Sequence, residues 1–151
     1  MAGLTTSITA ALTISAFVLC GCGHGPKGLS GPAYDASVRA ISALERADEH
    51  KDDPEIAFTP FLTEYQKAVD EVGIAGGRDG WRSADHGAWS QFQGCLSVLH
   101  SYRSVHDGVL FDLQRLALLR LPAEVSEENK TRIADATFEL NKCVMEARAF
   151  E

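Results

Sequence analysis

The sequence contains no charged side chain before Lys27. All 14 lysines and arginines and all 21 aspartates and glutamates lie in the rest of the chain, which therefore carries the whole net charge of -7. An acidic surface repels phosphate backbones and anionic lipid headgroups, so we expect neither nucleic-acid binding nor polybasic attachment to a membrane. At 151 residues, with 45% hydrophobic and 23% charged side chains, the chain has the size and composition of one folded domain.

The chain also lacks the short motifs that mark common active sites. No Glu lies three residues before any of the five histidines, and neither a C-x-x-C pair nor a C-x-x-C-H haem-attachment sequence occurs. Residues 23–28 fit the G-x-G-x-x-G spacing, but Pro26 lies within it and no predicted strand precedes it. His86 follows Asp85, an order that suits a catalytic base or, alternatively, a helix start capped by Asp. We expect no enzymatic activity, no cofactor and no metal.

The uncharged N-terminal segment is typical of an export signal. Residues 4–19, LTTSITAALTISAFVL, are mostly apolar but carry six hydroxyl side chains. They are also fewer than the ~20 apolar residues of a membrane-spanning helix. A secretory signal has a shorter apolar region that ends in small residues near a cleavage site. Residues 1–21 are therefore predicted to be a cleaved signal peptide.

Residues 19–22, LCGC, resemble the lipobox of bacterial lipoproteins: an aliphatic residue, two small residues and the cysteine that receives lipid. The resemblance implies that Cys22 becomes the mature N-terminus and carries several acyl chains, which anchor a protein stably. It also implies a place in the cell envelope, on the outer membrane of a two-membrane bacterium because Gly23 rather than Asp follows. A zinc site of Cys20, Cys22 and His24 is disfavoured, because two to four residues usually separate paired zinc cysteines, only Gly21 separates these, and a fourth ligand is lacking.

The remainder of the chain predicts a helical domain behind a tether. Glycine and proline in residues 22–32 predict a flexible tether, which leaves residues 33–151 as the domain. Apolar residues recur at three- and four-residue spacing, and no segment sustains the period-two alternation of strands. The predicted helix starts are Pro32, Thr59, Ser83 and Ser126. We predict an all-α bundle of four or five helices.

The stretch Gly73–Gly80 is the only glycine-dense part of the domain and predicts a loop. Arg78, Trp81 and Arg82 lie in or beside it. Tryptophan next to arginine is the composition of a binding hot spot, so these residues are a candidate partner contact. The alternative is a lid that closes the open end of the bundle. Trp89 lies on an apolar stripe and is expected in the core.

Cys95 and Cys143 are predicted to form a disulfide, because they are the cysteines left in an exported, oxidising setting. The alternative is two buried thiols that never meet. If the third helix were straight and the last packed antiparallel to it, Cys95 would lie ~39 Å from the turn and Cys143 ~26 Å. A disulfide joins Cα atoms within about 7 Å. We therefore predict a break in the third helix near His106, Asp107 and Gly108.

These features predict a membrane-anchored helical lipoprotein that acts as a binding or interaction module, with an envelope protein as its partner. The alternative is a small-ligand or metal carrier that uses a cavity inside the bundle. A retained small molecule in the native mass spectrum would favour the carrier, and a co-purifying protein would favour the interaction module.

Overall fold

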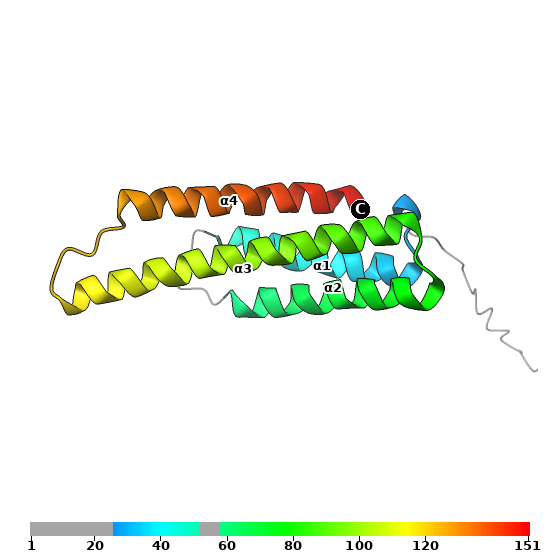
Figure 1. The fold of residues 1–151 in the computed structure, drawn as a ribbon, viewed down its shortest axis with the longest axis horizontal. Coiled ribbons are helices and arrows are strands. Elements are labelled where there is room, and N and C mark those ends of the chain that lie inside the picture. Colours follow the sequence, from blue (N-terminus) through cyan, green and yellow to red (C-terminus); the bar gives the residue numbers. More distant parts are fainter. Residues whose placement is uncertain (1–25, 52–57) are drawn as a thin grey trace, which may run out of the picture.

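The computed structural model describes residues 26–51 and 58–151 of the chain. Its four long helices form an antiparallel up-and-down bundle (Figure 1), and no strand occurs in the described part. The α-helices are α1 (Gly31–Glu49), α2 (Thr59–Asp79), α3 (Ser83–Leu118) and α4 (Glu127–Ala147). Short 3-10 helices, η1 (Pro26–Gly28) and η2 (Arg148–Phe150), flank them. The predicted all-α bundle is confirmed.

The predicted signal peptide, the lipobox with Cys22 and the first residues of the tether lie outside the described residues. None of the described helices is both long enough and apolar enough to cross a bilayer.

The predicted helix starts are confirmed, each to within one residue. Pro32 and Pro60 lie in the first turns of α1 and α2. Backbone N–H groups there have no acceptor within the helix, so the missing N–H of proline costs no helical hydrogen bond. Ser126 caps α4, since its hydroxyl accepts a hydrogen bond from the Asn129 N–H at 3.2 Å. Two glutamates follow in the first turn of α4, where their negative charges interact favourably with the positive end of the helix dipole.

The core combines small residues on α1 with aromatic side chains from the other helices. Five alanines of α1 are completely buried at three- and four-residue spacing, and they allow neighbouring helices to approach closely: Ala33, Ala36, Ala40, Ala43 and Ala47. Tyr65 of α2 fills part of the space, and its hydroxyl donates to the Phe92 carbonyl of α3 at 3.0 Å. Burial raises the pKa of the Tyr65 phenol far above its ordinary value, so the group stays a neutral donor.

The folded domain begins earlier than predicted, because residues 29–32 belong to it and not to a flexible tether. Leu29 is completely buried in the core. The N–H of Ser30 donates to the Asp85 carboxylate at 3.1 Å, and Gly31 already opens α1. An apolar side chain and a buried acceptor therefore hold this segment against the bundle.

The predicted loop at Gly73–Gly80 is wrong, since α2 continues as a helix to Asp79. The glycines make room for tryptophans. A Cβ atom on Gly73 would lie 2.7 Å from the Trp89 ring nitrogen, and one on Gly76 would lie 2.9 Å from the Trp81 ring. Contact with these rings compensates for the ~1 kcal/mol by which glycine disfavours a helix.

The predicted break in the third helix is also wrong. α3 is one continuous helix of 36 residues, yet the Cα atoms of Cys95 and Cys143 are 5.6 Å apart. The prediction assumed that α4 begins level with the end of α3. Instead, the connection of residues 119–126 runs back beside α3, and α4 begins short of its end (Figure 1). Eight residues can span ~26 Å, which exceeds the mismatch of ~13 Å along the axis.

Candidate functional site

The start of α1 and the α2–α3 connection lie at one end of the bundle, which we call the tether end (Figure 1). Trp81 is half-buried there. Its ring centroid lies 4.1 Å from that of His86 and 5.5 Å, edge to face, from that of Trp89. Trp81 also covers Gly76. This geometry is that of a lid over the bundle end.

Arg82 of the predicted partner contact is engaged within its own chain. Its Nε donates to Asp85 Oδ2 at 3.2 Å, and the other oxygen of that carboxylate accepts from the Ser30 N–H. Asp85 is only 1% exposed, so the two interactions compensate for its burial. Asp85 therefore joins the chain before α1 to α3, and both of its carboxylate oxygens accept hydrogen bonds from Ser30 or Arg82. Of the three predicted contact residues, only Arg78 is exposed.

Trp89 was expected in the core and lies at the surface, 36% exposed. It is on the side of α3 that faces α2, where Gly73 leaves room for the part of the ring that carries its nitrogen. The predicted core position of Trp89 is therefore wrong, because the apolar spacing did not show that a ring of this size would remain partly outside.

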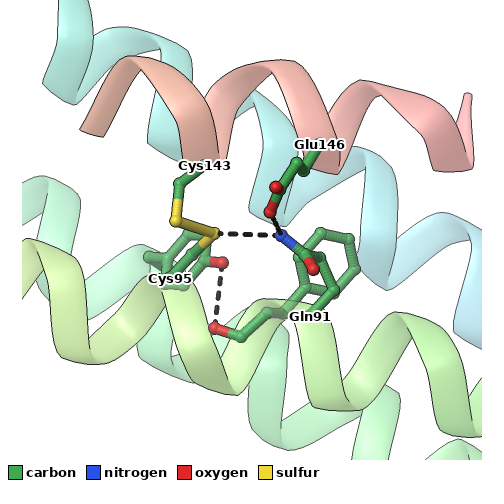
Figure 2. Close-up of a disulfide and its surroundings, with 6 residues drawn as sticks. Gln91, Cys95, Cys143 and Glu146 are labelled. Carbon is green, nitrogen blue, oxygen red and sulfur yellow. Dashed lines mark hydrogen bonds between the residues drawn. A yellow bond between two sulfur atoms is a disulfide. The ribbon is translucent and has the colours of Figure 1, made fainter. Parts of the chain in front are cut away.

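The predicted pairing of Cys95 with Cys143 is confirmed, and it clamps α3 to α4 (Figure 2). Both cysteines are buried. One turn toward the tether end, Gln91 Nε2 donates to Glu146 Oε2 at 2.9 Å, and the same nitrogen lies 3.7 Å from Cys95 Sγ. The α3–α4 pair is therefore held by a covalent and a polar link within one turn of each other.

At the opposite end of the bundle, α3 and α4 extend past α1 and α2 as a two-helix projection (Figure 1). We call residues 108–130 the arm. Nine large hydrophobic residues are exposed in the described part of the chain, and four of them lie within eleven residues of the arm. These four form the apolar patch: Phe111 (66% exposed), Leu118 (86%), Leu119 (60%) and Leu121 (52%).

The end of α3 holds the patch in a defined geometry. The Arg120 N–H donates to the Ala117 carbonyl and the Leu121 N–H to the Leu116 carbonyl, both at 3.0 Å. This is the Schellman arrangement that ends helices, in which glycine usually takes the left-handed position. Here Arg120 takes it, with φ 56°. The leucines on either side of Arg120 are therefore fixed by backbone hydrogen bonds.

The inner side of the arm is packed, in contrast to its outer side. Val109 and Asn129 are buried, and Asn129 Nδ2 donates to Asp112 Oδ2 at 3.4 Å. A small groove of about 170 Å³ separates the end of α3 from the connection, and Arg115 and Glu124 are among the residues that line it. The arm is thus packed on its inner side and exposes four large apolar side chains near the end of α3.

Several grooves lie between helices in the described part of the chain, and one of about 570 Å³ lies between the start of α1 and the end of α2. A groove of about 440 Å³ lies between α1 and α2, where Arg39 and Arg46 form ion pairs with Glu71 and Glu64 of the facing helix. Another, of about 400 Å³, lies between α3 and α4. Within residues 26–51 and 58–151, no three His, Cys, Asp or Glu side chains are placed to hold a metal ion.

No protein-family model matches the chain, and no significant match was found among curated proteins or solved structures.

Proposed function

We propose that this protein is an exported, lipid-anchored interaction module of the cell envelope that binds its partner through the arm. The apolar patch is the observation that carries the proposal. Contiguous exposed apolar side chains on a soluble domain mark interaction sites, whereas single exposed residues do not. At the tether end, where the sequence offered a candidate contact beside the alternative of a lid, Trp81 and Arg82 are engaged within the chain.

The arrangement of the helices suits an anchored module. The chain enters the bundle at Pro26–Gly31, at the end opposite the arm (Figure 1). At 1.5 Å per residue, the 36 residues of α3 span ~54 Å. An anchor on Cys22 therefore holds the tether end near the membrane and presents the apolar patch roughly 50 Å farther out.

Cell fractionation tests the lipid anchor. Cys22→Ala is expected to release the protein into the soluble fraction and to stall signal processing. Cys20→Ala is the matched control, because it changes the neighbouring cysteine and leaves the lipidated residue in place. Membrane attachment that survives Cys22→Ala would contradict lipidation and favour an uncleaved signal anchor.

Affinity capture of the anchored protein from its own membranes tests the arm. Leu118→Glu is expected to lose captured partner protein, since it places a charge at the centre of the patch. Met145→Glu is the matched control: Met145 is also highly exposed, at 74%, but lies near the end of α4 at the tether end. Equal capture by both variants would show that the arm is not the binding surface.

A further inference from the structure

We infer that the groove between the start of α1 and the end of α2 binds the headgroup of a zwitterionic phospholipid, in which two carbons link a phosphate to an ammonium group. The inference rests on the proposed function, because the anchor on Cys22 is what brings this groove to a membrane. Three properties of the groove carry it: its place in the bundle, its two open charges of opposite sign, and its size.

The groove lies where the anchored chain enters the bundle. Pro32 at the start of α1 and Arg78 at the end of α2 both line it, and these helix ends lie at the tether end (Figure 1). Three residues separate Cys22 from Pro26, and a fully extended chain of this length spans ~14 Å. An anchor on Cys22 therefore holds this groove at the level of the lipid headgroups.

An ion pair closes the inner end of the groove. Arg39 of α1 and Glu71 of α2 line it and pair with each other, so these two residues lie level across the groove. Seven residues farther toward the tether end on each helix come Pro32 and Arg78, which therefore also lie level. The remaining charges of the groove lie between its inner pair and the tether end.

These remaining charges are Asp35 and Arg78, and they have opposite signs. Both are exposed, and within residues 26–51 and 58–151 neither forms an ion pair or a side-chain hydrogen bond, although they line the same groove. Asp35 lies three residues inside the level of Arg78, which is ~4.5 Å along the helix axis. A phosphate at Arg78 and an ammonium at Asp35 satisfy both charges, and the two-carbon link spans a similar distance. A purely anionic ligand would instead be repelled by Asp35.

The size of the groove and its apolar side chains also suit a lipid headgroup. Its volume of about 570 Å³ falls in the range of small-ligand sites. Ile74 lines it and is 54% exposed, so it can contact the glycerol and the first methylenes of the lipid. In the groove of about 440 Å³ between the same helices, both arginines are ion-paired and Lys67 is the one charge left among the lining residues. A zwitterion is therefore matched only by the groove at the tether end.

Native mass spectrometry of the full chain, extracted from its own membranes with detergent, tests the inference. The probes are phosphatidylethanolamine and phosphatidylglycerol with identical acyl chains, added in equal amounts. The phosphatidylethanolamine adduct is expected to exceed the phosphatidylglycerol adduct by ~tenfold, because only its headgroup satisfies both charges. Equal adducts, or an excess of phosphatidylglycerol, would overturn the inference.

Neutral substitutions test the two charges one at a time. Arg78→Gln is expected to lower the phosphatidylethanolamine adduct by ~tenfold, and Asp35→Asn is expected to abolish the preference between the two lipids. Lys142→Gln on α4 and Glu49→Gln at the other end of α1 are the matched controls, since both are exposed and lie outside the groove. A preference that survives Asp35→Asn would overturn the assignment of the ammonium.

The same spectra report the lipid anchor independently of the groove. The intact mass of the chain shows whether it carries acyl groups, whatever the added lipids do. An acylated chain that does not distinguish the two lipids would overturn the headgroup site and leave the proposed anchor standing. A chain without acyl groups that still prefers phosphatidylethanolamine would support the headgroup site and contradict the anchor.

Discussion

The two ends of the bundle use similar residue types in opposite ways. At the tether end, Trp81 and Trp89 pack against each other and over helix glycines, and the buried carboxylate of Asp85 is satisfied from two sides. At the arm, four large apolar side chains are exposed and Arg120 occupies a backbone conformation that suits glycine. At the tether end these side chains are engaged within one chain, whereas at the arm the large apolar side chains remain exposed. Under the proposed function, the binding surface lies at the arm, where the sequence did not suggest it.

The disulfide is expected to make the largest single contribution to stability, because it links α4 covalently to α3 and α4 has little packing of its own. α4 buries only two large apolar side chains besides the cysteine, Leu140 and Val144. On the chain-entropy model, closing a loop with a separation of 48 residues stabilises by ~4 kcal/mol. Cys95→Ser with Cys143→Ser should lower the free energy of unfolding by about that amount in a urea titration. An unchanged urea midpoint would show that packing alone holds α4 against the other helices.

Asp85 tests how firmly the tether end is held. Asp85→Ala removes the acceptor of the Ser30 N–H and the partner of Arg82, and it should destabilise the protein by ~2–3 kcal/mol. Hydrogen exchange should show the loss locally, as faster exchange of the amides at the start of α1. Asp135→Ala, on the exposed side of α4, is the control and should change exchange little.

Gly76 tests whether the tryptophan lid requires glycine in α2. Gly76→Ala places a methyl group 2.9 Å from the Trp81 ring and should destabilise by ~1–3 kcal/mol through overpacking. Gly77→Ala is the matched control, since its Cβ comes no closer than 3.9 Å to the same ring. The free energy of unfolding of the Gly77→Ala variant should rise by up to ~1 kcal/mol, because alanine has the higher helix propensity. Equal effects of the two substitutions on the thermal midpoint would contradict the lid.

Arg120 gives the smallest expected effect, and its sign is opposite. Arg120→Gly relieves the left-handed strain at the end of α3 and should stabilise by ~1 kcal/mol. Arg115→Gly, inside the helix, should instead destabilise by about 1 kcal/mol. A loss of stability in Arg120→Gly would mean that the Arg120 side chain contributes more than its backbone strain costs.

Local patterns in the sequence were enough to predict the helices, their starts and the disulfide partners. Proline positions, the Ser126 cap and apolar spacing act within one helix, so they can be recognised without a structure. The errors arose where two helices meet. Glycine is usually a helix breaker, and only the position of Trp81 shows why Gly76 remains helical. Similarly, the register between α3 and α4 depends on a connection that runs back along α3, which no periodicity reveals.

The apolar patch was missed for a related reason. The apolar stripe of α3 continues through Val109, Leu113 and Leu116, whereas Phe111 and Leu118 lie on the opposite side of the helix and were not part of it. A partial signal was available, because Leu118, Leu119 and Leu121 depart from the helical spacing just before Pro122. Leucines at adjacent positions of a helix end cannot all face one core.

The central claim is that a partner covers the arm in the membrane while the tether end is closed by its own chain. Hydroxyl-radical footprinting of the full chain tests it most directly, by comparing side-chain oxidation in native membranes with that of dilute, detergent-purified protein. The account predicts that Phe111 and Leu118 are protected in the membrane and oxidised when purified, while Met145 is oxidised equally in both. Equal oxidation of Phe111 and Leu118 in both samples would contradict it.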